Sequence, residues 1–107
     1  MEAQTVQGYP ENADYCIRHN ETHACYCKDD LFRQPDDSIR DYSSLTEANA
    51  ACEKLASQLT AIAEAGLHGS DDLPLTGSLR VYPVADLYSL EIDEYQKAKN
   101  ARNKNAK

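Results

Sequence analysis

One stretch of the chain has a clear helical period, and the remaining segments must fold around it. Between Ser44 and Leu67 the sequence reads SLTEANAACEKLASQLTAIAEAGL, in which apolar residues recur three and four positions apart. These apolar residues are Leu45, Ala48, Cys52, Leu55, Leu59 and Ile62. The spacing places them in one stripe along an α-helix whose opposite side is polar. Because a single amphipathic helix is marginally stable alone, the pattern predicts a second layer that covers this stripe.

Capping residues mark both ends of the helix. Ser44 is followed three residues later by Glu47, which is the pattern of a capping box at a helix N-terminus. Gly66 follows the last periodic residue and suits the left-handed backbone conformation that ends many helices. The sequence therefore predicts a helix over residues 45–65, with the role of a scaffold rather than of a recognition element.

A β-hairpin is predicted over residues 14–28. The segments DYCIRH and ACYCK are rich in strand-favouring side chains, and they flank NETH, a plausible turn. In this hairpin Ile17 lies opposite Tyr26, and Cys16 lies opposite Cys27. Neither face is plainly polar, so we expect the cysteine-bearing face to be partly covered as well.

The remaining segments complete an α+β fold class. Residues 79–85, LRVYPVA, predict a third strand, and Pro83 confines that strand to a sheet edge or marks its end. The charged segment 29–43 is interpreted as a long ordered loop or a short strand. Residues 86–98 fit a helix or a strand, and we favour a second helix. The expected architecture is a small antiparallel sheet, formed by the hairpin 14–28 and the strand near 79–85, packed on one long helix.

The length of 107 residues favours one domain. We expect residues 1–13 to be a flexible arm, residues 14–96 a single α+β domain, and residues 97–107 a basic, disordered tail. No window approaches the roughly 20 apolar residues that span a bilayer, and the N-terminus lacks the features of a signal peptide. A cytoplasmic protein without membrane contact is therefore expected. Seven tyrosines exceed what so small a core can place, which favours a homodimer or a partner-binding face.

Charge is distributed unevenly along the chain. All 18 acidic residues and only six of the 11 basic residues precede residue 97, so residues 1–96 carry a net charge of −12. Such a body should attract basic surfaces and repel nucleic acid, whereas the tail should do the reverse. Acidic residues cluster mainly in the expected loops, and a solvated face that only confers solubility is the competing interpretation. The candidate partner-binding residues are Asp36, Asp37, Asp41, Asp71, Asp72, Glu91, Asp93 and Glu94.

Five potential zinc ligands lie within the predicted hairpin, namely Cys16, His19, His23, Cys25 and Cys27. Structural zinc sites usually separate paired ligands by two to four residues, whereas Cys25 and Cys27 are separated by one. In a reducing compartment these thiols are expected to be free, buried core residues. We therefore predict no metal and no cofactor, and a zinc-binding or thiol redox sensor that uses Cys16, Cys25 and Cys27 stays an alternative.

Catalytic motifs are missing from the sequence, which contains no phosphate-binding glycine loop, G-x-S-x-G elbow or H-E-x-x-H pair. An enzyme is therefore not predicted. The charge pattern instead favours a non-enzymatic acidic module that binds a basic surface of another protein. A small dimeric regulator whose basic tail contacts nucleic acid is a further alternative.

The layout of residues 15–55 resembles that of short accessory proteins that phages and prophages encode. It consists of the hairpin YCIRHNETHACYC, a charged link and the capped helix SSLTEANAACEKL. Small acidic inhibitors of host defence, including anti-CRISPR proteins, are similar to this chain in size and charge. The resemblance implies an inhibitor that occupies a basic, nucleic-acid-binding surface of a host protein complex, in the cytoplasm of the host cell.

Overall fold

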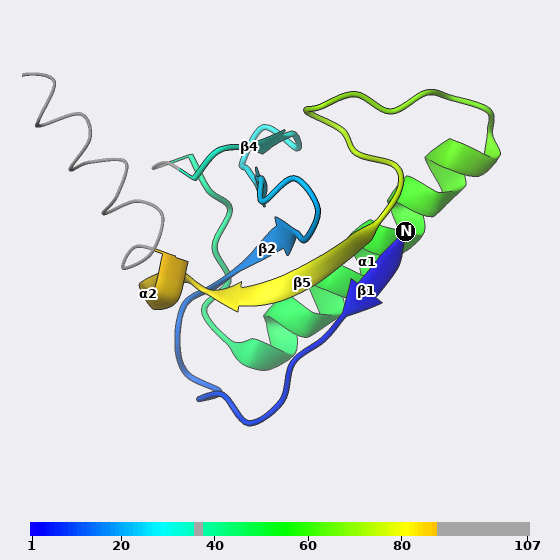
Figure 1. Cartoon of the computed structure of the whole chain (residues 1–107). Coiled ribbons are helices and arrows are strands. Elements are labelled where there is room, and N and C mark those ends of the chain that lie inside the picture. The colour runs from blue at the N-terminus through cyan, green and yellow to red at the C-terminus, as the bar shows by residue number, and fades with distance from the viewer. Residues whose placement is uncertain (36–37, 88–107) are drawn as a thin grey trace, which may run out of the picture.

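The computed structural model of the chain describes residues 1–35 and 38–87, which form a mixed sheet with one long helix across a face (Figure 1). The strands are β1 (Glu2–Gln4), β2 (Tyr15–His19), β3 (Cys25–Tyr26), β4 (Phe32–Arg33) and β5 (Ser78–Pro83). The helices are α1 (Leu45–Glu64) and α2 (Val84–Leu87). Across the sheet the strands are ordered β1-β5-β2-β3-β4. The predicted α+β class is confirmed.

The long helix has the ends that the sequence predicts. The side chain of Ser44 accepts a hydrogen bond from the backbone N–H of Glu47 at 3.1 Å, which satisfies one donor of the first turn. At the other end Gly66 has a φ of +83°, and its N–H donates to the carbonyl of Ala63 at 3.0 Å. This left-handed glycine closes the helix in the manner expected of a C-terminal cap.

The hairpin has the predicted register. Arg18 pairs with Cys25 across β2 and β3, which places Ile17 opposite Tyr26 as expected. The third predicted strand is β5, which pairs antiparallel with β2. β5 is not an edge strand, because β1 lies on its other side. Pro83 is the last residue of β5 and lies beyond the residues that pair with β1. The N–H that proline lacks is therefore not needed for pairing with β1.

The sheet is mixed rather than purely antiparallel, because residues 1–13, expected to be a flexible arm, contain β1. β1 runs parallel to β5 from the pair Glu2 and Ser78 to the pair Gln4 and Arg80. Three residues are too few to show a strand period in the sequence. The side chain of Asn49 on α1 then holds the chain after β1 with two hydrogen bonds to the backbone of Val6.

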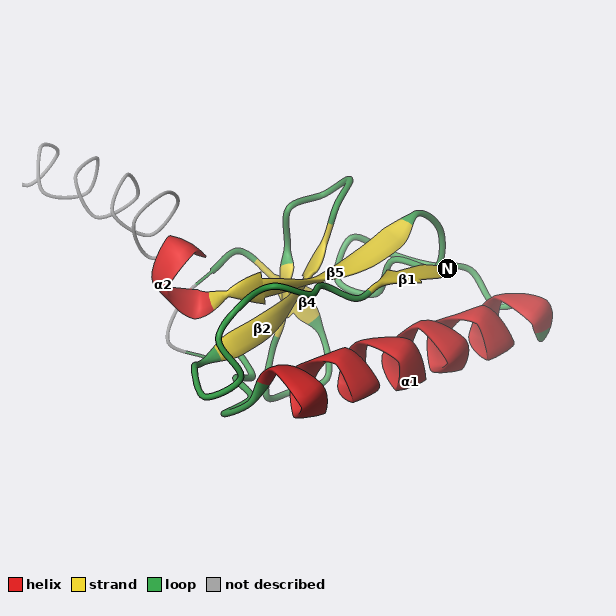
Figure 2. Cartoon of the chain, turned by 90° about the horizontal axis from the view of Figure 1, so that it is seen from below, coloured by secondary structure: helices red, strands yellow, loops and turns green. Residues whose placement is uncertain are grey.

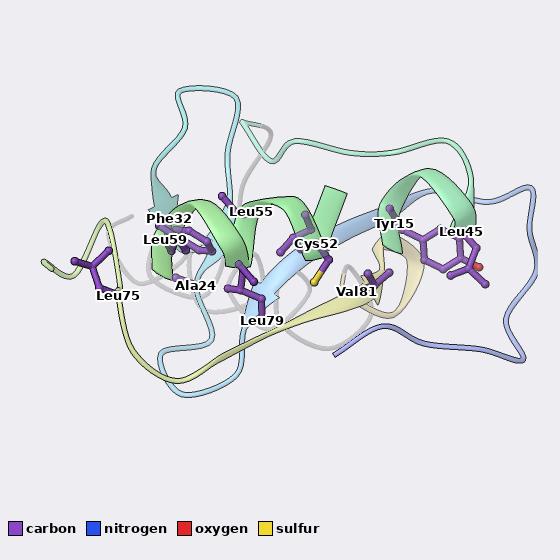
Figure 3. Close-up of a cluster of buried hydrophobic side chains, with 13 residues drawn as sticks. Tyr15, Ala24, Phe32, Leu45, Cys52, Leu55, Leu59, Leu75, Leu79 and Val81 are labelled. Carbon is purple, nitrogen blue, oxygen red and sulfur yellow. The ribbon is translucent and has the colours of Figure 1, made fainter. Parts of the chain in front are cut away.

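Both faces of the sheet carry buried side chains, and Figure 2 shows α1 lying along one of these faces. The apolar stripe of α1 packs on one face, in a buried cluster that includes the residues labelled in Figure 3. The opposite face holds a smaller buried cluster, formed by Cys16, Cys25, Ile39 and Leu87. The expectation that the cysteine-bearing face is also covered is confirmed.

The segment after the hairpin contributes the short strand β4, one of the two outcomes expected for residues 29–43. The second helix begins at Val84, two residues before its predicted start, and the structure describes it to Leu87. The rest of the predicted range, 88–98, lies outside the described residues. In the described part of the chain, no helix combines the length and apolar character needed to cross a membrane.

Candidate partner-binding site

A hollow of about 460 Å³ opens where the turn after β2 meets the loop before β5. Two carboxylate side chains line it, Glu21 from the turn and Asp71 from the loop. Its walls include the buried residues Pro74 and Leu75. We call this feature, with Glu21 and Asp71 on its lining, the acidic hollow.

Glu21 is fixed in place but remains open to solvent. The backbone N–H of Ser78 donates to Oε2 of Glu21 at 3.1 Å, and the Ser78 hydroxyl donates to Oε1 at 3.3 Å. The bond from the Ser78 backbone is the main reason that the pKa of Glu21 lies below its usual value, and the bond from the hydroxyl adds to this effect. The side chain is nevertheless 55% exposed. Glu21 therefore presents a fixed negative charge at neutral pH.

The side chain of His19 also lines the acidic hollow and is only 3% exposed. Its Nε2 lies 2.8 Å from the carbonyl oxygen of Thr76, and its Nδ1 receives the backbone N–H of Thr22 at 3.1 Å. A carbonyl can only accept a hydrogen bond, so Nε2 carries a proton, and the same nitrogen lies 3.4 Å from Oε2 of Glu21. Both ring nitrogens are thus engaged, and the structure gives no hydrogen bond between His19 and Ser78. These contacts fix the orientation of the imidazole ring beside Glu21.

Gly77 allows the two loops to approach each other. Its φ of +94° lies in the left-handed region that favours glycine. A Cβ at this position would overlap the Glu21 carboxylate and lie 2.9 Å from Nε2 of His19. The Glu21 carboxylate can therefore occupy its position only because residue 77 is a glycine.

The loop that carries Asp71 and Asp72 is tied to the sheet. The N–H of Phe32 in β4 donates to the carbonyl of Asp72 at 2.7 Å, so the loop bends back toward β4 (Figure 1). Ser70 and Leu73 bond to each other through their backbones in both directions, which closes the turn. Asp71 and Asp72 are exposed, and neither forms an ion pair with any residue in the described ranges.

The other predicted partner-binding residues do not join this site. Asp41 is exposed but lies toward the cysteine-bearing face. There a hydrogen bond with Cys25 and burial raise the pKa of the Cys16 thiol, and the charge of Asp41 adds to the rise. The remaining candidates, Asp36, Asp37, Glu91, Asp93 and Glu94, lie outside the described residues.

Two neighbouring acidic residues are already neutralised within the chain. Asp29 forms an ion pair with Arg33, and Asp30 forms one with Arg40 at 3.0 Å. Among the acidic residues near β4, Asp71 and Asp72 therefore have the charges most available to a partner.

Sequence reasoning missed Glu21, which we treated only as part of the hairpin turn. The predicted hairpin register places the turn NETH, and with it Glu21, next to His19. This position in the turn is the signal that could have marked Glu21 as a candidate. What the sequence does not show is that the loop before β5 returns to the same corner. Glu21 and Asp71 are 50 positions apart and share no periodic pattern.

None of the four cysteines forms a disulfide, and all four are fully buried. Cys16, Cys25, Cys27 and Cys52 each show 0% exposure, and burial raises the pKa of Cys52 to about 11. Within residues 1–35 and 38–87, no group of three or more His, Cys, Asp or Glu side chains is placed to hold a metal ion. Thiolate chemistry requires access and a low pKa, and the burial of these thiols supplies no access.

Comparison with known proteins gives no relative from which a function could be transferred. No protein-family model, curated protein or solved structure matches the chain. The acidic hollow and the charges around it are therefore the observations from which a function can be inferred.

Proposed function

We propose that this protein is a non-enzymatic binding module whose acidic hollow receives a lysine or arginine side chain from a partner protein. The observation that carries the proposal is that Glu21 and Asp71 line one hollow, and neither has a Lys or Arg partner in the described part of the chain. A cationic head group would lie between the two carboxylates in charge-assisted hydrogen bonds. Its aliphatic stem would pack on Pro74 and Leu75.

The charge of the whole body supports a basic partner surface. The described residues include 13 acidic and six basic side chains, a net charge of −7. A field of this sign speeds encounter with positively charged surfaces and opposes contact with nucleic acid. Protein surfaces that bind nucleic acid are rich in Lys and Arg. A module seated on such a surface would exclude the nucleic acid, so the proposed outcome of binding is inhibition.

The biological setting belongs to the same proposal. A cytoplasmic location and an inhibitor of the kind that phages encode are supported by the size and charge of the chain and by the layout of residues 15–55. The homodimer stays a prediction. The alternative regulator depends on a basic tail, residues 97–107, which lies outside the described residues.

An oligoarginine peptide tests the proposal by calorimetry. We expect binding that weakens steeply with salt, because added salt shortens the Debye length from roughly 30 Å at about 0.01 M to roughly 8 Å at about 0.15 M. The matched peptide with citrulline in place of arginine has the same shape without the charge, and it should not bind. Asp71→Asn should weaken binding by about tenfold, the loss of one charge-assisted hydrogen bond.

The control variant is Glu53→Gln, which removes the same charge from the exposed side of α1. At about 0.15 M salt it should change the affinity by less than about twofold, since an exposed charge farther away than the Debye length is screened. Equal losses in Asp71→Asn and Glu53→Gln would show attraction to net charge alone, and the acidic hollow would then have no role.

A further inference from the structure

A second hollow lies on the helix side of the molecule and differs in chemistry from the acidic hollow. Its volume is about 490 Å³, and it lies between α1 and the chain around β3 and residues 40–42. The half-buried side chains of Ile62 and Leu73 contribute to its apolar floor. Tyr26 and Tyr42 line it as well. We call it the tyrosine groove.

Among the charged side chains that line this groove, one cation has no ion pair within the described ranges. Burial and the hydrogen bond to Asp30 raise the pKa of Tyr26 to about 12, and burial raises the pKa of Tyr42, so both phenols are neutral at physiological pH. The charged lining residues are then Asp30, Arg40 and Lys54. Asp30 and Arg40 form an ion pair at 3.0 Å, whereas Lys54 has no ion pair within the described ranges. The lining residues alone carry a net charge of +1, and the nearby charge of Glu47 also acts on Tyr42.

Aromatic rings and donors are also arranged for a flat ligand. The Arg40 guanidinium lies 5.4 Å from the centroid of the Tyr26 ring, and the Tyr26 ring is tilted at 46° against Phe32 with centroids 5.3 Å apart. These contacts restrict Tyr26 and Arg40 before any ligand arrives. The Tyr42 hydroxyl forms no hydrogen bond within the described part of the chain, so it can donate to a ligand.

We propose that the tyrosine groove binds a small organic anion with a flat apolar body, whose carboxylate or sulfonate group pairs with Lys54. The volume falls within the roughly 300–1,000 Å³ of typical small-molecule sites, which combine an apolar lining with a few polar groups. A cationic ligand would meet two positive side chains and only one negative one. This binding function is separate from the capture of a basic partner, because the two hollows share no lining residue and prefer ligands of opposite charge.

Two dyes with nearly the same ring system test the proposal. The anionic dye is 8-anilinonaphthalene-1-sulfonate, and the neutral dye is N-phenyl-1-naphthylamine, which lacks the sulfonate. We expect saturable one-to-one binding of the anionic dye by fluorescence and calorimetry. Lys54→Gln, at an exposed helix position, should weaken the anionic dye about threefold to fivefold, the loss of one partly exposed ion pair. The affinity of the neutral dye should not change.

Lys28→Gln is the control, because Lys28 is exposed and does not line the groove. It should leave both affinities within about twofold of the parent. Ala51→Phe fills the groove and should abolish binding of both dyes while far-UV circular dichroism stays that of the parent. The proposal is overturned if the anionic dye does not saturate, if Lys54→Gln and Lys28→Gln weaken it equally, or if folded Ala51→Phe still binds it.

Discussion

At the scale of single residues, Gly77 is the position where one added methyl group tests the geometry of the acidic hollow. Gly77→Ala forces a non-glycine residue into positive φ, displaces the Glu21 carboxylate and brings a Cβ within 2.9 Å of Nε2 of the buried His19. We expect a loss of about 2–4 kcal/mol in the free energy of unfolding, of which the left-handed backbone accounts for about 1–2 kcal/mol. Urea denaturation measures the loss.

The chain offers a matched control for this substitution at Gly8. Gly8 has a φ of +86°, but a Cβ there would meet nothing within 4 Å. Gly8→Ala should therefore lose only the backbone contribution of about 1–2 kcal/mol. If both variants lose the same free energy, the loop before β5 does not approach Glu21 as closely as described.

Glu21 also gives the protein a predictable dependence on pH. Its folded pKa lies below the ordinary value of 4.5, because the bonds from Ser78 favour the ionised form. A depressed carboxyl pKa stabilises the fold above the unfolded pKa, and this contribution disappears as the pH falls through the folded pKa. In Glu21→Gln the difference in stability between neutral pH and pH values below about 4.5 should therefore be smaller than in the parent.

Thermal unfolding over a pH series checks this expectation. Glu53→Gln serves as the control, because Glu53 is exposed on α1 and has no hydrogen bond to its side chain within the described ranges. An unchanged pH profile in Glu21→Gln would contradict the bonds between Glu21 and Ser78.

At the scale of elements, the sequence predicts the helices and strands that have a local periodic pattern or a recognisable turn. The 3.6-residue period and the caps define α1, and the turn defines the register of β2 and β3. β1 could not be predicted, because a three-residue strand pairs through backbone atoms that carry no pattern. The acidic hollow could be predicted only in part for a similar reason. Asp71 was a candidate as an exposed loop acid, but its position beside Glu21 depends on how two loops meet in space.

The burial of the four cysteines by these elements makes their reactivity a test of the redox alternative. All four thiols are fully buried, and access to reagent requires local or global opening. We expect Ellman's reagent to react with them slowly in the native protein and at once in denaturant. Rapid labelling of native Cys16, Cys25 or Cys27 would instead support a thiol sensor.

At the scale of the whole molecule, two hollows of opposite preference lie at different places on one small fold. The acidic hollow depends on the turn after β2 and the loop before β5, whereas the tyrosine groove depends on α1, β3 and the segment before α1, with Leu73 added from the loop before β5. The overall charge favours contact with a basic surface, and the acidic hollow gives that contact a location. The net charge could be predicted from the sequence. That Glu21 and Asp71 line the same hollow could be seen only in the folded structure.

The most direct test of this location is a titration of ¹⁵N-labelled protein with the oligoarginine peptide, followed by amide chemical shifts. We predict that the largest shifts cluster on the acidic hollow, at Glu21, Thr22, Ser70, Asp71 and Gly77. They should diminish with added salt and in Asp71→Asn. Shifts confined to the exposed side of α1, or spread evenly over all acidic residues, would contradict the proposal that the acidic hollow receives the basic side chain.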